Sequence, residues 1–162
     1  MSYIMICLQG PKMDEYGNDT EILELAIARE EDANKFFLIM AARAERPEIR
    51  KVFEELAAEE LEHKAKLELE VMKSGRVVKA TKKVEIKADD DPETGIPKLD
   101  MDYKHMLMLG IHKEDASFRL YVDLAARVSS EEAYETLLAL AEEEVKHKLR
   151  FEMEYENLLK TK

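Results

Sequence analysis

The chain has 162 residues, of which 38% are charged and 46% hydrophobic, with five Gly, four Pro and no Trp. This length suits one domain with its own core, and the composition is typical of long amphipathic helices rather than of a turn-rich sheet. The formal net charge of -11 argues against a nucleic-acid partner, because phosphate binding requires clustered Lys and Arg side chains. We therefore expect an all-α protein.

The cysteine content and the first apolar residues exclude further classes. Cys7 is the single cysteine, so the sequence has no disulfide framework and no cysteine pair for a zinc or rubredoxin-type iron site. The apolar run 4–8 lacks a basic flank and is too short for a signal peptide or a membrane span. We expect a cytoplasmic protein that does not act on a membrane.

Two helices are predicted in the first half of the chain, after an amino-terminal segment that ends at residue 19. Asp19 or Thr20 can cap the first helix, which we expect to span 20–44 before the sequence ERPE interrupts it. Pro47 suits the first turn of a second helix, expected over 47–75. Together they form an antiparallel helix hairpin.

Two more helices follow a long connection. Residues 75–101 collect Gly, Pro and acidic side chains without a helical period, with a possible short strand at 84–87. The third helix is predicted over 102–128. The fourth follows the sequence SSEE, where Ser129 and Glu132 have the spacing of a capping box, and continues nearly to the carboxyl end.

An internal repeat relates the two halves. Shifting 23–70 onto 107–154, an offset of 84 residues, gives sixteen identities without a gap. A helix of about 27 residues is about 40 Å long, and an extended connection can cross that length in about a dozen residues. Residues 20–162 are therefore predicted to form a ferritin-like four-helix bundle, with two helix hairpins joined by one long crossover.

Each repeat carries the same set of metal-ligand residue types. A glutamate lies three positions before a histidine in the second helix of each hairpin, so both side chains share one helix face. The first helix of each hairpin adds a glutamate on an apolar stripe, and a buried carboxylate requires a proton, a cation or a metal. The candidate ligands are Glu30, Glu60, His63, Glu114, Glu144 and His147.

This inventory of four carboxylates and two imidazoles is that of the di-iron and di-manganese carboxylate bundles. It suits iron or manganese better than copper or structural zinc. One alternative stays open within each repeat, because Glu59 and Glu143 lie four positions before the histidines and can also share their face.

Over about 140 residues the sequence resembles the ferritin-like domain of the rubrerythrin family, with the motifs E-x6-F/Y and E-x-x-H each present twice. The resemblance implies two iron ions; manganese, a mixed iron–manganese pair, or zinc in purified protein are alternatives. It also implies that the two E-x-x-H glutamates bridge the metals. The implied assignment is Glu30, Glu60 and His63 for one metal and Glu114, Glu144 and His147 for the other, with Glu60 and Glu144 bridging.

Two features depart from rubrerythrin. A rubredoxin domain is missing from these residues, which implies a separate electron donor such as a rubredoxin-like protein. Rubrerythrins also carry a glutamate three residues after the third-helix ligand, and that position here is Ser117. A serine hydroxyl can hydrogen-bond a ligand or a bound water but supplies no charge, so we expect weaker peroxide chemistry than in classical rubrerythrin.

Aromatic and histidine side chains near the candidate ligands allow further expectations. Tyr121, equivalent to Phe37 in the repeat, either packs in the core or donates its hydroxyl to a metal ligand and is oxidised transiently; it is the candidate catalytic residue. His105 and His112 are expected on the exposed side of the third helix.

The resemblance therefore predicts a non-haem di-iron oxidoreductase that reacts its reduced centre with peroxide or dioxygen. Two alternatives remain: ferritin-like iron oxidation and storage, and a structural bundle that metals only stabilise. We expect a homo-oligomer, with a dimer favoured, in which the long crossover would allow helix pairs to exchange between subunits.

Overall fold

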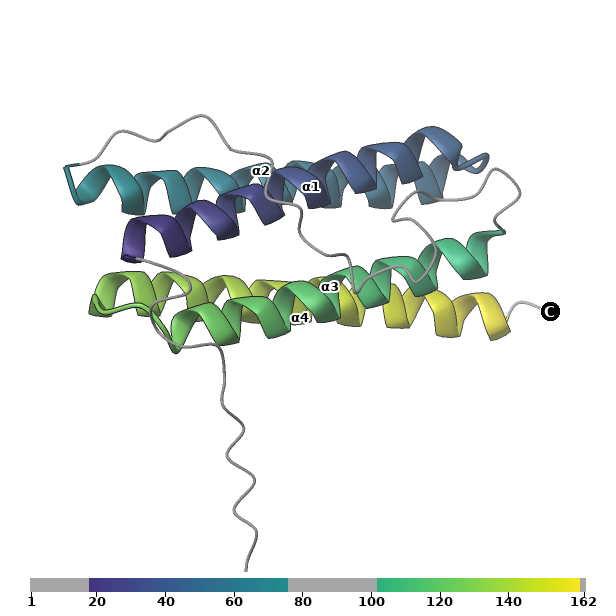
Figure 1. Ribbon diagram of the computed structural model, residues 1–162. Coiled ribbons are helices and arrows are strands. Elements are labelled where there is room, and N and C mark those ends of the chain that lie inside the picture. The colour runs from purple at the N-terminus through teal and green to yellow at the C-terminus, as the bar shows by residue number, and fades with distance from the viewer. Residues whose placement is uncertain (1–17, 76–101, 161–162) are drawn as a thin grey trace, which may run out of the picture.

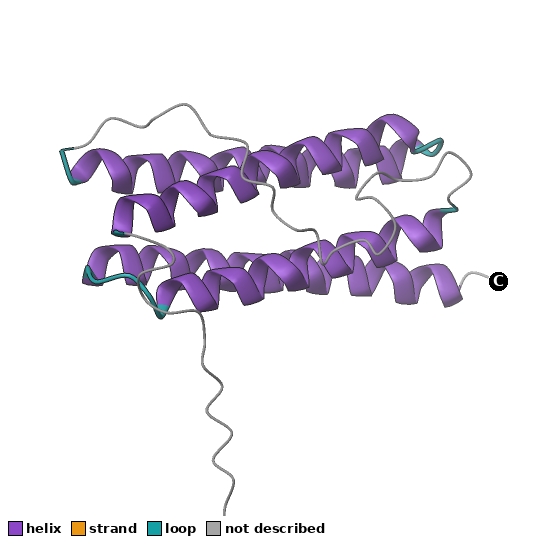
Figure 2. Ribbon diagram, in the orientation of Figure 1, coloured by secondary structure: helices purple, strands orange, loops and turns teal. Residues whose placement is uncertain are grey.

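The computed structural model describes residues 18–75 and 102–160, and these residues form four helices and no strand (Figures 1 and 2). The predicted strand at 84–87, Cys7 and most of the amino-terminal segment lie outside the described residues. The helices are α1 (Asp19–Arg43), α2 (Pro47–Lys73), α3 (Tyr103–Ala125) and α4 (Glu131–Lys160).

The helices form two stacked hairpins, with α1 and α2 in one layer and α3 and α4 in the other (Figure 1). The end of α2 and the start of α3 lie at opposite ends of the bundle, so the chain between them must span its length. This arrangement confirms the predicted all-α four-helix bundle with one long crossover. None of the described helices is long and apolar enough to cross a membrane.

The helix starts agree with the sequence for α2 and α3. Pro47 is the first residue of α2, where its missing N–H costs nothing. The carboxylate of Asp102 accepts a 3.0 Å hydrogen bond from the backbone N–H of His105 and caps α3. α3 ends at Ala125, three residues before the predicted end.

The caps of α1 and α4 differ from the prediction by one residue. Asn18, not Asp19 or Thr20, caps α1 by accepting from the backbone N–H of Glu21 at 3.1 Å. Asp19 is unavailable because its carboxylate accepts from the N–H groups of Ser129 and Ser130, at 2.7 and 2.8 Å, and so ties α1 to the turn before α4.

The cap of α4 also lies one residue from the predicted one, at Ser130 rather than Ser129. The N–H of Ser129 is bound by Asp19, and the hydroxyl of the next residue, Ser130, accepts from the N–H of Ala133 at 3.1 Å. Ser130 is therefore the cap, and the predicted capping box with Glu132 does not form.

The repeat is visible in the contacts between helices. Lys64 on α2 donates to Glu31 on α1 at 2.5 Å, and the equivalent Lys148 on α4 donates to Asp115 on α3 at 2.9 Å. The two hairpins are thus held by matching ion pairs as well as by matching apolar faces.

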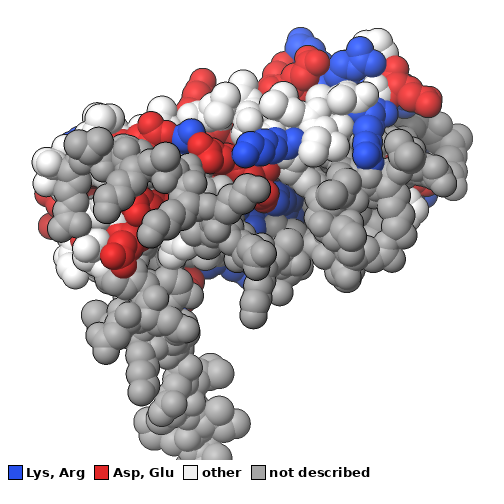
Figure 3. Space-filling view, turned by 45° about the horizontal axis from the view of Figure 1, so that its top comes forward, with Lys and Arg blue, Asp and Glu red and all other residues white. Residues whose placement is uncertain are grey.

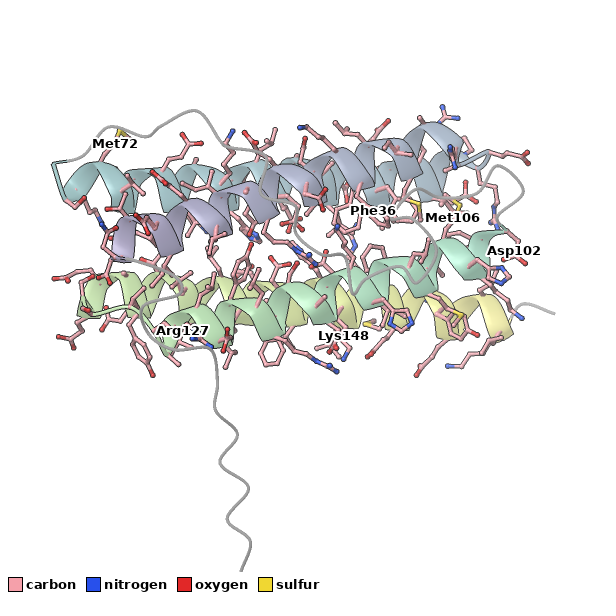
Figure 4. All side chains as sticks on the ribbon, viewed as in Figure 1. Phe36, Met72, Asp102, Met106, Arg127 and Lys148 are labelled. Carbon is pink, nitrogen blue, oxygen red and sulfur yellow. The ribbon has the colours of Figure 1, made fainter. Side chains whose placement is uncertain are left out.

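Two apolar clusters fill the bundle at either side of its middle. One is formed around Ile22, Leu137 and Tyr121. The other contains Phe37, Phe53 and Phe151, whose ring centroids lie 5.7–6.3 Å apart. In Figure 4 the labelled Phe36 and Met106, members of this second cluster, lie between the two hairpins toward the start of α3. These clusters keep water away from the middle of the bundle.

A glycine on α3 permits the close approach of α4. A Cβ atom at Gly110 would lie 2.8 Å from the Phe151 ring, closer than carbon atoms pack, so only glycine fits without movement. The equivalent residue in α1 is alanine.

The charged side chains on the surface are mixed. On the face in Figure 3, Lys and Arg side chains of the described residues lie among Asp and Glu rather than in one basic surface.

Candidate metal centre

The six predicted ligands meet in the middle of the bundle. Each is at most 4% exposed, although carboxylates are rarely buried unless paired. The helical period explains the convergence, since each E-x-x-H pair presents both side chains to the interior and each single glutamate faces it from the neighbouring helix. The contributors are Glu30 from α1, Glu60 and His63 from α2, Glu114 from α3, and Glu144 and His147 from α4.

These side chains form two overlapping groups, in each of which the ligand atoms lie within 4.8 Å of one another. We call them the first position (Glu30, His63) and the second position (Glu114, His147). Glu60 and Glu144 belong to both groups. These two glutamates, which the resemblance implied as bridging ligands, are thus the ones placed to contribute to both positions.

The imidazoles point one nitrogen at the carboxylates. Nδ1 of His63 lies 3.0 Å from Glu144, 3.2 Å from Glu60 and 3.5 Å from Glu30. Nδ1 of His147 lies 3.3 Å from Glu60 and 3.5 Å from Glu114. The two rings stack, with centroids 5.4 Å apart and planes 12° from parallel.

Most of the inward-facing atoms have no hydrogen-bond partner. Among the described residues this holds for both carboxylate oxygens of Glu60, Glu114 and Glu144 and for Nδ1 of His63 and His147. Buried polar atoms without partners are costly, and native proteins contain few of them. Eight such atoms converging on one point fit a pair of cations. Their oxygen and imidazole chemistry suits iron or manganese.

Burial and neighbouring carboxylates change the pKa values of the four glutamates. Burial, together with a neighbouring carboxylate, raises the pKa of Glu30, Glu114 and Glu144 well above the usual range. Burial acts in the same direction on Glu60, but the neighbouring Glu30 carboxyl and both imidazoles hold its pKa below the usual range. Without a cation, several of these groups must stay protonated.

The pKa values of the two imidazoles are also raised. Burial alone would lower their pKa values, but the surrounding carboxylates outweigh it. The nearby carboxylates of Glu144, Glu30 and Glu60 raise the pKa of His63, and Glu60 is the main carboxylate raising that of His147 to about 8. A bound metal would replace these protons, since it requires neutral imidazole and ionised carboxylate.

Tyr121 lies beside the cluster, in contact with one ligand. Its hydroxyl donates to Oε1 of Glu30 at 2.5 Å, and its side chain is fully buried. The predicted contact with a ligand is therefore present. Phe37, the repeat equivalent, has no hydroxyl and packs on Phe53 and Phe151. Of Glu30 and Glu114, the single glutamates of α1 and α3, only Glu30 therefore accepts a hydrogen bond from a tyrosine among the described residues.

The structure also resolves the choice within each glutamate pair. Glu60 and Glu144 face the cluster, whereas Glu59 and Glu143 lie outside it. Glu59 instead reaches the outward nitrogen of His147, with 2.6 Å between its Oε2 atom and Nε2. The sequence signalled both glutamates of the pair but did not indicate that one would support a histidine.

Ser117 is buried between α1 and α3, where its partner is a cation. Nε of Arg29 donates to its hydroxyl at 3.0 Å, and a second nitrogen of Arg29 donates to the carbonyl of Lys113 at 3.2 Å. The hydroxyl of Ser117 thus accepts from a buried cation, a partner that the sequence did not predict. Arg29 is only 3% exposed; nothing in the sequence distinguished it from a surface arginine.

The remaining histidines lie where the helical period placed them. His105 and His112 are both exposed, and Nδ1 of His105 lies 2.7 Å from the Asp102 carboxylate at the start of α3. Asp102 is labelled at this end of the helix in Figure 4. Neither histidine belongs to the cluster.

Comparison with known proteins gives one family and two solved structures of similar fold. Residues 21–155 match the family model described as rubrerythrin. A hypothetical protein from Pyrococcus furiosus superposes with a TM-score of 0.67 at 23% identity, covering 89% of this chain and 92% of that one. A putative ferritin-like diiron-carboxylate protein from Thermotoga maritima superposes with a TM-score of 0.66 at 21% identity, covering 87% and 96%. Curated proteins give no significant match.

Proposed function

The chain belongs to the rubrerythrin family, and we propose that it is a non-haem di-iron oxidoreductase whose reduced centre reacts with peroxide or dioxygen. Two observations carry this proposal. Eight inward-facing ligand atoms have no hydrogen-bond partner within 18–75 and 102–160, and the carboxylates of Glu60 and Glu144 belong to both metal-binding groups. The six side chains that would hold the metals are those of the first and second positions together with Glu60 and Glu144. Manganese, a mixed pair or zinc would use the same atoms.

Two iron ions held side by side supply, when bound, the electrons that cleave an O–O bond. The protein's part is to fix geometry and exclude water. Four helices each contribute a ligand, so the cluster is held on rigid elements rather than on loops. The apolar residues on either side of it, including Phe37 and Leu137, keep the surroundings at low polarity.

We assign to Tyr121 the role of a hydrogen-bond donor that keeps its proton and holds the Glu30 carboxylate. Burial and the Glu30 carboxylate raise the pKa of its hydroxyl well above the usual range, so the proton stays on the tyrosine oxygen. There it holds Oε1 of Glu30 in place by donating to it. The hydroxyl is also the nearest oxidisable group that the structure places on a candidate ligand.

The electrons would come from a separate protein. A rubredoxin-type iron site needs four cysteine thiolates, and the sequence has only Cys7. A rubredoxin-like donor therefore fits the proposal.

We further propose that the protein is a cytoplasmic homodimer, with helix pairs exchanged between its subunits.

A second candidate function is the oxidation and binding of ferrous iron, as in ferritins. The hydrogen bond from Arg29 to Ser117 favours it, because the position at which rubrerythrins place a further glutamate, a fifth carboxylate, is here a neutral hydroxyl bound to a cation. We therefore expect peroxide turnover to be slower than in classical rubrerythrins. A bundle in which metals are only structural remains the third reading.

Stopped-flow mixing of the protein, loaded anaerobically with two equivalents of ferrous iron, with peroxide and separately with dioxygen distinguishes the three. Rapid oxidation that repeats when a reductant is supplied supports the oxidoreductase. Oxidation that repeats only with fresh ferrous iron, in a protein that elutes as a closed cage on size exclusion, supports storage. Iron that reacts with neither oxidant contradicts both. The His112→Ala variant, altered on the exposed side of α3, is the matched control.

A further inference from the structure

The internal repeat predicts two equal metal positions, and the candidate ligands are of the same residue types in both halves. Glu30 and His63 of the first position are matched by Glu114 and His147 of the second. The residues that touch these ligands from outside do not follow the repeat. The outer contacts differ between His63 and His147 and between Glu30 and Glu114. Each difference changes how strongly a ligand can donate electrons to a metal.

His147 has a carboxylate on its outer nitrogen. Its Nδ1 faces Glu60 and Glu114, at 3.3 and 3.5 Å, so Nε2 points outward and lies 2.6 Å from Oε2 of Glu59. For Nδ1 to bind a metal, Nε2 must carry the proton and donate it to Glu59. A carboxylate in this place fixes the tautomer and the ring, and makes the imidazole a stronger ligand.

His63 has no such support from its repeat-equivalent glutamate. The carboxylate of Glu143 instead accepts a hydrogen bond from Nζ of Lys146 at 2.9 Å. The described residues give Nε2 of His63 no carboxylate acceptor. The imidazole of the first position thus lacks the outer carboxylate that makes an imidazole a stronger metal ligand.

One exposed residue in each repeat explains this difference. Lys146 lies one helical turn after Glu143, where opposite charges attract. The equivalent residue one turn after Glu59 is Glu62, whose like charge cannot hold Glu59 on the surface of α2. Glu59 is therefore free to bind His147, whereas Glu143 is drawn to its own helix.

The glutamates differ in the same direction. Tyr121 donates to Oε1 of Glu30, which withdraws electron density from a ligand of the first position. Both oxygens of Glu114, in the second position, have no hydrogen-bond partner among the described residues and keep their full capacity for a metal. The first position therefore has the weaker histidine and the weaker glutamate.

We propose that the two metal positions are inequivalent, that the second position binds its cation more tightly and fills first, and that Glu59 is the positioning residue responsible. This inference rests on the proposed di-metal function. Outer carboxylates of this kind typically change metal affinity about 10- to 100-fold. The two affinities are expected to differ by a factor in that range.

Titration of the metal-free protein with Co²⁺, followed by calorimetry and by visible absorption, measures both affinities directly. Wild type should bind two equivalents in two resolved steps. His147→Ala should remove the tighter step and His63→Ala the weaker one. Glu59→Gln should weaken the tighter step about 10- to 100-fold, whereas the matched control Glu143→Gln should leave both steps within about twofold.

Glu62 and Lys146, the exposed residues one turn after Glu59 and Glu143, allow a test that changes no residue in contact with a ligand. Glu62→Lys should draw Glu59 away from His147 and weaken the tighter step. Lys146→Glu should release Glu143 toward His63 and tighten the weaker step. Circular dichroism establishes that each metal-free variant is folded before titration.

The possible results separate this inference from the proposed function. Two identical affinities in wild type, or equal effects of Glu59→Gln and Glu143→Gln, would overturn the inequivalence and leave the di-metal site standing. A folded wild-type protein that binds no Co²⁺, or only one equivalent, would overturn the di-metal function and this inference with it.

Discussion

The hydroxyl of Tyr121 on α3 donates to the carboxylate of Glu30 on α1 across the middle of the bundle. This hydrogen bond links the two hairpins at a candidate metal ligand. In Tyr121→Phe the oxygen of a buried carboxylate loses its partner, which typically costs about 1–3 kcal/mol.

We therefore expect Tyr121→Phe to unfold at lower urea concentration than wild type in the metal-free form, while still binding two metal ions. Urea unfolding and metal analysis of the same samples check this. Unchanged stability would mean that the hydrogen bond is not formed in solution, and loss of one metal would mean that the tyrosine is itself a ligand.

Metal stoichiometry should fall in steps that follow the sharing of ligands. Glu60 belongs to both positions, so Glu60→Ala should bind no stable pair, whereas His147 belongs to one, so His147→Ala should retain one metal. His112→Ala should retain two, because that side chain is exposed. Metal analysis after gel filtration measures this order; equal content in all three variants would refute the site assignment.

The stability of the metal-free protein should fall as the pH rises. The pKa of His147 is raised from 6.5 to about 8, so its contribution is complete below pH 6.5 and disappears as the pH passes about 8. The raised pKa values of Glu30, Glu114 and Glu144 act in the same direction from the ordinary value of 4.5 upward. The lowered pKa of Glu60 adds stability that is constant in this range.

One pKa unit corresponds to about 1.4 kcal/mol, and about 1 kcal/mol changes the Tm of a domain of this size by about 2–4 °C. We expect the Tm of metal-free protein to drop by several degrees between pH 6.5 and 8, as measured by calorimetry. Metal binding displaces protons, so the Tm increase that metal produces should grow over the same interval. A metal-free Tm that rises with pH would contradict the carboxylate cluster.

Arg29 determines what a carboxylate at position 117 could do. Because Arg29 already donates to Ser117, the longer side chain in Ser117→Glu would meet a guanidinium before it met a metal. We expect Ser117→Glu alone to leave peroxide turnover nearly unchanged, and Ser117→Glu combined with Arg29→Ala to increase it. Steady-state peroxide reduction with a common reductant compares the two, with Arg29→Ala alone as control. A full gain from Ser117→Glu alone would show that Arg29 does not hold the position.

The helices and the ligands could be predicted because their signals are local and occur twice. An E-x-x-H pair on a periodic helix fixes which side chains share a face, and the second copy at the same offset made chance improbable for Glu60 with His63 and Glu144 with His147. The cap of α1 was misplaced by one residue because contacts distant in sequence, from the N–H groups of Ser129 and Ser130, engage the Asp19 carboxylate.

The roles of Arg29 and Glu59 could not be predicted for a related reason. Glu59 and Glu60 are neighbours on one helix, and only the packing of α2 against α4 decides which faces the cluster and which faces His147. Arg29 is buried because α1 and α3 meet there, which no pattern within α1 reveals. Contacts between distant elements therefore decide the asymmetry of the site, whereas the repeat decides its ligands.

Mössbauer spectroscopy of protein loaded with ⁵⁷Fe and then exposed to oxidant tests most directly whether Glu60 and Glu144 hold two iron ions in common. Shared carboxylates place the ions close enough for their spins to couple. We predict two ferric ions per chain with a diamagnetic ground state, and loss of this coupling in Glu60→Ala. One iron per chain, or two ferric ions that behave as isolated paramagnets, would contradict a shared centre.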